Sequence, residues 1–223
     1  MARIARVVAE NIPHHVIQRG NRNQPVFFSD EDKSAYLNIL QKHLKINEVS
    51  IWAWCLMDTH VHFVAVPSDK ETFCRAFAET HRLYSRMINF RGGWRGYLFQ
   101  GRFSSFPMDE NYLYAAVRYV ENNPVKAGIA KNAHDYKWSS AAAHVLGSSD
   151  PILSRCFLDL EIRDWNNFLR SGIDKESDML DKYAKTGRPL GDGSFVEKLE
   201  RLIKRPLKKA KPGPKKRQGV VRV

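Results

Sequence analysis

The sequence predicts an α+β domain built on one antiparallel sheet. Two apolar segments of strand length, 49–57 and 60–66, are separated by only two residues, which is typical of a hairpin. Segments 29–46 and 69–90 instead place apolar residues every three or four positions, as amphipathic helices do. A chain of 223 residues is long enough for one such domain and an extension.

In chain order we expect a strand, a helix, a hairpin of two strands, a second helix, a fourth strand and one further helix. Ser29 or Asp30 caps the first helix, adjacent glycines end the second, and Pro124 follows the last. This β-α-β-β-α-β order is that of a ferredoxin-like sheet, to which a C-terminal helix is added. The predicted ranges are 13–21 with a short continuation at 26–28, then 29–46, 49–57, 60–66, 69–90, 103–107 and 110–123.

Strict alternation along the hairpin predicts which side chains share a face. It puts Ser50, Trp52, Trp54 and Leu56 on one face of the first strand, and it puts His60, His62, Val64 and Val66 on one face of the second. The other face of the first strand would carry Val49, Ile51, Ala53, Cys55 and Met57.

The chain divides into three predicted regions. Residues 1–147 form the main domain, in which Trp138 is expected to pack. Residues 148–203 are predicted to be a small helical extension that includes an amphipathic helix at 194–204. Residues 204–223 hold nine Lys or Arg and no acidic residue, together with Pro and Gly, and are predicted to be a disordered basic tail.

The net charge of +12 is concentrated in that tail. The first 203 residues carry 27 basic and 24 acidic side chains, a net charge of only +3. A dense Lys/Arg run is typical of a non-specific, salt-sensitive DNA-binding arm, and a solubilising tail is the alternative.

Cysteine usage and hydropathy indicate a reducing compartment. Cys55, Cys74 and Cys156 are odd in number and far apart, and no CxxC pair is present, so the sequence indicates neither a disulfide framework nor a thiolate zinc site. No signal peptide precedes the domain and no apolar run is long enough to cross a membrane. We therefore expect a cytoplasmic protein.

Two histidines on one strand form half of a candidate metal site. His60 and His62 are two residues apart, so a strand sets their imidazoles side by side, although such a pair is more often structural. Tyr119 and Asn123 are four residues apart on a helix that Asn123 ends, and the Asn123 amide oxygen could complete the site. Otherwise Tyr119 is a core aromatic and Asn123 a helix cap.

These residues resemble a known family. "HVH" at 60–62, followed by "YVENNP" at 119–124 and then "VKAG", resembles the single-tyrosine HUH transposases, and most closely the REP-associated tyrosine transposases. Further similar segments are "HHVIQRGNRNQPVFF", "LFQGRF", "YKWSSAAAH" and "TGRPLG".

The resemblance implies a metal-dependent transposase that cuts single-stranded DNA near REP-like hairpins. It implies that Tyr119 is the nucleophile, which forms a 5′-phosphotyrosine and releases a 3′-hydroxyl. His60 and His62 would be metal ligands and Asn123 the third, at a position where related enzymes use Gln, Glu or His. By ligand softness two imidazoles would suit zinc or nickel, whereas the resemblance implies Mg²⁺ or Mn²⁺.

Other tyrosines and histidines compete for these roles. Tyr112 lies on about the same helix face as the predicted nucleophile and Tyr114 on a different one, but neither has the Asn-Pro in register. His14, His15 and His81 are expected to contact DNA or fill the core rather than bind a metal.

Basic loops are the predicted DNA contacts. Aromatic residues and glycines are interleaved there with the candidates Arg19, Arg22, Arg91, Arg95 and Arg102, a mixture suited to single strands, although solvated loops would look similar. Expected partners are single-stranded or hairpin DNA in the nucleoid, while the sequence does not decide between a monomer and a homodimer. Two other functions remain open, a DNA-binding regulatory module that no longer cuts and a phosphodiesterase that uses water.

Overall fold

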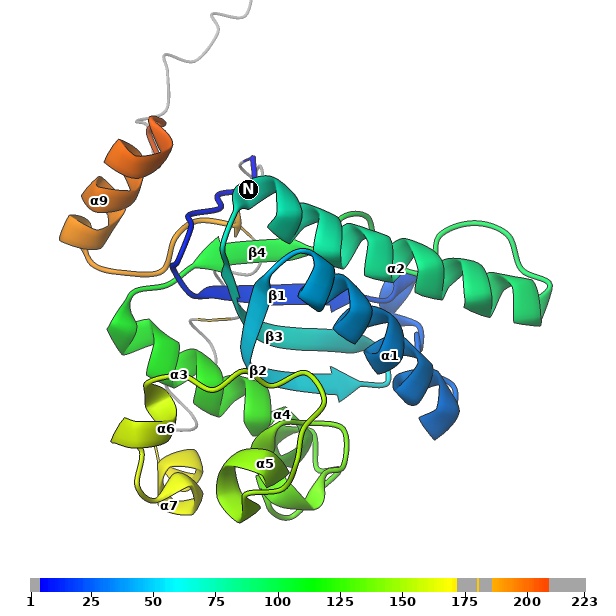
Figure 1. Ribbon diagram of the computed structural model, residues 1–223. Coiled ribbons are helices and arrows are strands. Elements are labelled where there is room, and N and C mark those ends of the chain that lie inside the picture. Colours follow the sequence, from blue (N-terminus) through cyan, green and yellow to red (C-terminus); the bar gives the residue numbers. More distant parts are fainter. Residues whose placement is uncertain (1–4, 172–179, 181–185, 209–223) are drawn as a thin grey trace, which may run out of the picture.

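Four strands form one antiparallel sheet in the computed structural model, which describes residues 5–171, 180 and 186–208. The order across the sheet is β2-β3-β1-β4, as Figure 1 shows. β1 (His14–Arg19) pairs with both β3 (His60–Pro67) and β4 (Ser104–Pro107), and β2 (Val49–Met57) pairs with β3. The predicted ferredoxin-like order is confirmed.

The predicted strand continuation at 26–28 is wrong. These residues belong to no strand, because the backbone N–H groups of Val26 and Phe27 both donate to the Asp58 carbonyl at the hairpin turn. Both side chains are buried. The segment is therefore a packed loop, and a 3-10 turn (Asn21–Asn23) precedes it.

Helices α1 (Asp30–Ile46) and α2 (Lys70–Gly92) cover one face of the sheet (Figure 1). The Asp69 carboxylate accepts hydrogen bonds from the backbone N–H groups of Glu71 and Thr72 and so fixes the start of α2. Gly93, at φ +63°, ends it in the left-handed conformation that glycine adopts without strain. The core on this face is rich in buried aromatic residues, which include Tyr36, Phe63, Phe73, Phe77 and Tyr84.

The other face of the sheet carries α3 (Glu110–Glu121), which the Asp109 side chain caps. Around α3 lie the short helices α4 (Asn123–Lys126), α5 (Ala141–Leu146), α6 (Leu158–Glu161) and α7 (Trp165–Arg170), with a 3-10 turn (Ala133–Asp135) between α4 and α5 (Figure 1). The buried side chains between α3 and the sheet include Ile17, Val64, Phe106, Leu113 and Val117.

A β-bulge corrects the predicted faces of β2. Ile51 pairs with Ala65 but Ala53 pairs with Val64, so Trp52 is one extra residue that has no partner on β3. The extra residue moves every later side chain to the opposite face. Ile51 therefore packs with the α1/α2 core, whereas Ala53, Cys55 and Met57 pack under α3.

The C-terminal extension packs against the main domain. Leu153 bridges to Ile51 at one edge of the sheet, and Leu190 bridges to Met108 beyond β4. Helix α9 (Gly193–Ile203) buries Leu199 together with apolar residues of the N-terminal segment.

The boundary predicted for the basic tail, at residue 204, lies too early in the chain. Leu207 is buried, and the backbone N–H groups of Leu207 and Lys208 donate to the Glu200 carboxylate. Residues 209–223 lie outside the described residues. Within the part of the chain that is described, no helix has the length and apolarity to cross a membrane.

Candidate active site

Two imidazoles project from β3 on its α3 side. The rings of His60 and His62 lie 4.9 Å apart, as the spacing of two residues predicts. His62 is fully buried, whereas His60 is half-buried and its Nδ1 lies 2.9 Å from the Thr59 hydroxyl oxygen. One imidazole is thus enclosed by protein and the other is partly exposed.

A third imidazole, which the sequence did not predict for the site, comes from β1. His15 Nε2 lies 2.9 Å from His62 Nδ1, and the two rings stack with centroids 5.1 Å apart. The strand order contains the signal for it, because β1 is next to β3 and Ile17, two residues after His15, pairs with His62.

Tyr119 of α3 lies against this pair. Its ring meets His62 edge-on at 5.3 Å and His15 edge-on at 5.7 Å between centroids. The ammonium group of Lys126 is 5.6 Å from the centre of the same ring. The predicted nucleophile and one of the predicted ligands are therefore in direct contact.

Tyr114, one of the competing tyrosines, points elsewhere. Its hydroxyl donates to the Glu161 carboxylate of α6. Burial, together with this bond, raises the pKa of Tyr114 to about 12, so its phenol is harder to ionise than an ordinary tyrosine.

Asn123 begins a new helix and does not end α3. The α3 helix ends at Glu121, and Asn123 is the first residue of α4, where Pro124 is tolerated because its missing N–H has no helical partner. The Asn123 side-chain NH₂ donates to the Tyr119 carbonyl at 3.3 Å. This bond uses only the NH₂ group. The amide oxygen, which is the atom that a metal would bind, takes no part in it.

The electrostatics of the site fit a metal ligand set. Burial, reinforced by repulsion from His60, His15 and Arg19, holds the pKa of His62 well below its ordinary value, so this ring is neutral at pH 7. His62 Nε2 is buried and has no hydrogen-bond partner among the residues that the structure describes. A buried, neutral and unpartnered imidazole nitrogen is the atom that a divalent metal binds.

The structure brings His60 and His62 together as side chains that could hold a metal. Among the described residues, no three His, Cys, Asp or Glu side chains form a metal-holding group. The predicted third ligand, Asn123, would be an uncharged oxygen, and its printed side-chain hydrogen bond is to the Tyr119 carbonyl and not to either imidazole.

The remaining sequence-predicted histidines are structural. Ile12 O lies 2.7 Å from His14 Nδ1 and the Ala9 N–H donates to His14 Nε2, while His81 Nε2 is 3.0 Å from the Tyr36 hydroxyl. Burial lowers the pKa of His14 to about 4 and that of His81 to about 3. Both fill the core, as expected.

Three of the predicted DNA-contacting arginines lie where β1 ends. The backbone bonds Gln100 N to Arg19 O and Asn21 N to Leu98 O, each 2.8 Å, join the end of β1 to the loop after α2. Gly20 lets the chain after the 3-10 turn return close to the end of β1, because a Cβ there would lie 2.1 Å from the Gln24 carbonyl oxygen. This junction places Arg19, Arg22 and Arg102 on neighbouring segments.

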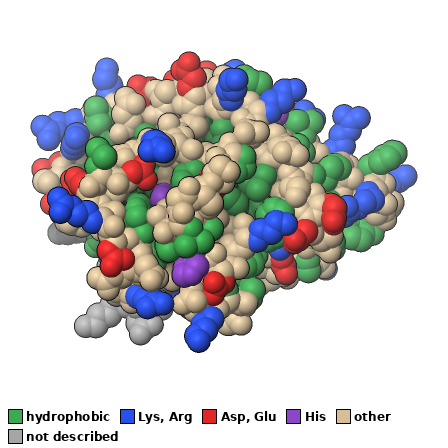
Figure 2. All heavy atoms as spheres, turned by 60° about the horizontal axis from the view of Figure 1, so that its bottom comes forward, with side chains coloured by type: hydrophobic (Ala, Val, Ile, Leu, Met, Phe, Trp, Pro, Cys, Tyr) green, Lys and Arg blue, Asp and Glu red, His purple; other side chains and the backbone are tan. Residues whose placement is uncertain are grey.

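Arg91 and Arg95 differ in their environment. Arg91 donates two hydrogen bonds to the buried Asp32 carboxylate, at 2.5 and 2.8 Å, and so ties α2 to α1. Arg95 is exposed in the loop beside Trp94 and Tyr97, two exposed aromatic residues. On the face seen in Figure 2, basic side chains are interspersed with acidic ones and do not gather in one patch.

Comparison with known proteins identifies the class. Residues 8–123 match the model of the family described as "Transposase IS200 like", and this span includes His60, His62, Tyr119 and Asn123. The match covers more than half of the chain. The protein belongs to the IS200-like transposase family.

The chain is also similar to solved structures. A REP-associated tyrosine transposase bound to a REP hairpin is 18% identical, with a TM-score of 0.57, and the match covers 70% of this chain and 93% of that one. A Deinococcus radiodurans crystal structure is 19% identical over 54% of this chain and 97% of its own, at a TM-score of 0.38. No curated protein matches.

Proposed function

We propose that this transposase cuts and rejoins single-stranded DNA beside REP-like hairpins through a covalent bond to Tyr119. The observation that carries the proposal is the buried, unpartnered Nε2 of His62, an imidazole whose ring packs edge-on against the Tyr119 ring. Family membership and the REP hairpin held by the similar solved structure support the substrate class.

His60, His62 and the Asn123 oxygen would hold Mg²⁺ or Mn²⁺, which would polarise the scissile phosphate and stabilise the charge that develops there. His15 would orient the His62 ring. Because His62 Nε2 needs a free lone pair, the His62 proton belongs on Nδ1 and is donated to His15 Nε2, 2.9 Å away.

Tyr119 then supplies the nucleophile. A tyrosine has a pKa near 10 and attacks only as the phenolate, which nearby positive charge favours. Lys126, whose ammonium is 5.6 Å from the ring, provides such charge from this chain.

In the first step the Tyr119 oxygen bonds to phosphorus and the bond to the 3′-oxygen breaks. The DNA end is kept as a 5′-phosphotyrosine, and the released 3′-hydroxyl takes up a proton. Attack by a 3′-hydroxyl on the same phosphorus reverses the step and joins two ends. The phosphodiester is thus conserved through the reaction, and no water is consumed.

A labelled hairpin with a single-stranded flank tests the proposal directly. Incubation with Mg²⁺ or Mn²⁺ is expected to give a protein–DNA adduct that is absent with a chelator and absent in Tyr119→Phe. Tyr112→Phe and Tyr114→Phe are the matched controls and should keep the adduct. An adduct that persists in Tyr119→Phe would contradict the proposal, and cut DNA without any adduct would favour attack by water.

A further inference from the structure

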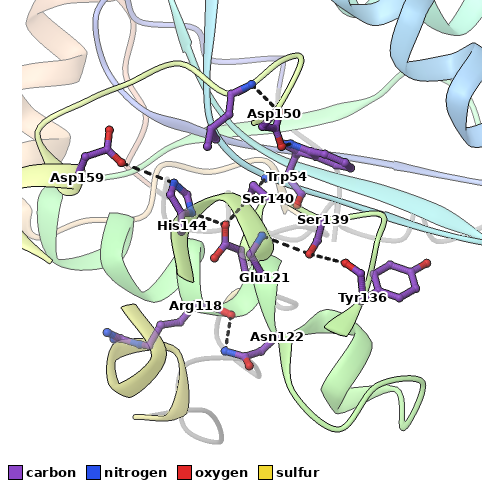
Figure 3. A network of polar contacts seen from close by, with 12 residues as sticks. Trp54, Arg118, Glu121, Asn122, Tyr136, Ser139, Ser140, His144, Asp150 and Asp159 are labelled. Carbon is purple, nitrogen blue, oxygen red and sulfur yellow. Dashed lines mark hydrogen bonds and ion pairs between the residues drawn. The ribbon is translucent and has the colours of Figure 1, made fainter. Parts of the chain in front are cut away.

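A buried network of polar contacts lies at the end of α3, just after Tyr119 in the chain (Figure 3). The Glu121 side chain is fully buried two residues after Tyr119 and two before Asn123. Its Oε1 accepts the Ser140 hydroxyl and lies 2.7 Å from His144 Nδ1. Its Oε2 has no partner among the residues that the structure describes.

His144 is the basic partner of Glu121 in this network. Burial opposes its charge, but attraction to Glu121 and the hydrogen bond to it outweigh burial and raise the pKa of His144. Its side chain is 3% exposed, and its ring stacks on Trp165 of α7 at 3.9 Å and nearly parallel. The His144 Nε2 atom faces Asp159 of α6 at 3.9 Å.

Ser140 connects this network to the sheet. Its hydroxyl accepts the Trp54 N–H at 2.9 Å, and its own N–H donates to the Trp54 carbonyl at 3.0 Å. Trp54 lies in β2, which pairs with the histidine-bearing β3 in register. A continuous chain of hydrogen bonds therefore runs from the sheet to the last turn of α3.

The extension holds the same turn from the other side. The Asn122 side-chain NH₂ donates to the Leu169 carbonyl of α7 at 2.7 Å and to the Arg118 carbonyl at 3.0 Å. Stability alone does not account for the network, because a buried ion pair is often no better than apolar residues of the same size. Placement of the neighbouring residues is the function that such a costly arrangement can serve.

We infer that Glu121, held by Ser140 and His144, is the positioning residue that fixes Tyr119 and Asn123 relative to His62. The inference rests on the proposed function for its consequence in catalysis. Tyr119 is on the α3 helix and the imidazoles are on the sheet, so a small shift of α3 would change the distance over which the phenolate must attack. Misplacement by about 1 Å can reduce a rate by about a hundredfold.

The test compares Glu121→Gln and Ser140→Ala with Tyr36→Phe. Glu121→Gln keeps the shape but removes the charge. Ser140→Ala removes the hydroxyl that joins Glu121 to the Trp54 N–H, and it leaves the backbone bond from Ser140 to the Trp54 carbonyl in place. Tyr36→Phe deletes the buried hydrogen bond to His81 on the opposite face, so it lowers stability without touching α3. Rates of adduct formation are measured at saturating hairpin DNA, at a temperature where each variant is folded.

Glu121→Gln and Ser140→Ala are expected to form the adduct about tenfold or more slowly, with hairpin affinity unchanged and Tyr36→Phe at the wild-type rate. A second readout does not need activity. In protein labelled with 3-fluorotyrosine, the ¹⁹F resonance that Tyr119→Phe removes should shift in both α3 variants and stay in place in Tyr36→Phe.

Wild-type rates together with an unmoved Tyr119 resonance in both variants would overturn the positioning role. A wild-type protein that forms no adduct would overturn the proposed function instead. In that case only the ¹⁹F resonance of Tyr119 tests the positioning role. A shift in the two variants would support that role, and an unmoved resonance would contradict it.

Discussion

His14 and His62 lie on adjacent strands and are both fully buried, but they face opposite sides of the sheet. On the α1/α2 side, both ring nitrogens of His14 have backbone partners, at Ile12 O and Ala9 N. On the α3 side, His62 uses one nitrogen for His15 and leaves the other without a partner among the described residues. A buried histidine with both nitrogens bonded is structural, whereas one with an unpaired nitrogen is available to a ligand.

The two faces of the sheet also differ in the kinds of side chain that pack on them. The α1/α2 face is filled by packed aromatic rings, whereas the α3 face has the small side chains Ala53, Cys55 and Ala116 and a group of polar ones. Small side chains let α3 approach the sheet, which brings Tyr119 onto His62. One face therefore supplies most of the packing, and the other supplies the chemistry.

The largest effect is expected from substitution at His62 compared with His14. His62→Gln should slow adduct formation at least a hundredfold per folded molecule, because the metal-binding nitrogen is lost. His14→Gln should lower the free energy of unfolding by about 1–3 kcal/mol, since buried partners lose their bonds. It should keep the wild-type rate per folded molecule, measured with the adduct assay and urea unfolding. Equal loss of activity in both variants would contradict the distinction between the faces.

Metal binding should distinguish the faces without any DNA. Mn²⁺ should raise the melting temperature of the wild type, because a ligand at a hundred times its Kd stabilises the folded state by about 2.7 kcal/mol. The shift should persist in His14→Gln and vanish in His62→Gln, as followed by calorimetry. A shift that survives in His62→Gln would place the ion elsewhere.

Lowering the pH should destabilise the folded protein through its structural histidines, His14 and His81. Their folded pKa values are about 4 for His14 and about 3 for His81, below the value of about 6.5 in the unfolded chain. Between these values the unfolded state binds more protons, so this contribution to stability is complete above pH 6.5 and is lost as the pH falls toward 4 and then 3.

Each such histidine should contribute a slope of about 1.4 kcal/mol per pH unit within its window. His81→Gln is expected to be less stable at pH 7 but to lose stability less steeply on acidification, as measured by urea unfolding at several pH values. A slope identical to that of the wild type would show that His81 does not titrate as its burial predicts.

The smallest effects separate Arg91, in the last turn of α2, from Arg95, in the loop that follows. Arg91→Ala should cost about 2 kcal/mol of stability, because the buried Asp32 carboxylate loses both of its guanidinium bonds. Arg95→Ala should leave stability unchanged but weaken hairpin binding severalfold and reduce the salt slope by about 1. Unfolding and salt-dependent binding measurements check the pair, and a stability loss in Arg95→Ala would mean that this exposed residue also supports the fold.

Most of the fold follows from local patterns in the sequence. The hairpin of β2 and β3 and the starts of α1, α2 and α3 follow from turn and capping residues close by in the chain, such as Asp69 and Asp109. The bulge at Trp52 could not be predicted in this way, because it depends on the pairing of β2 with β3 and not on a local signal. The same holds for the packing of Leu207, which depends on α9.

The candidate site was predictable in part. His60, His62, Tyr119 and Asn123 are predicted from spacing and resemblance, and the structure brings the Tyr119 and His62 rings into contact. His15 required the strand order, and the bond between Glu121 and His144 joins residues 23 positions apart that no short motif connects. The sequence therefore did not predict the contacts of the site that form only through tertiary packing.

Mass spectrometry of the adduct tests the central claim most directly. The protein is incubated with a hairpin oligonucleotide and Mn²⁺, digested, and searched for the peptide that carries DNA. We predict a 5′-linked nucleotide on the Tyr119 oxygen and a free 3′-hydroxyl on the released strand. A nucleotide on Tyr112 or Tyr114, or cleaved DNA with no modified peptide, would contradict the assignment of Tyr119 as the nucleophile.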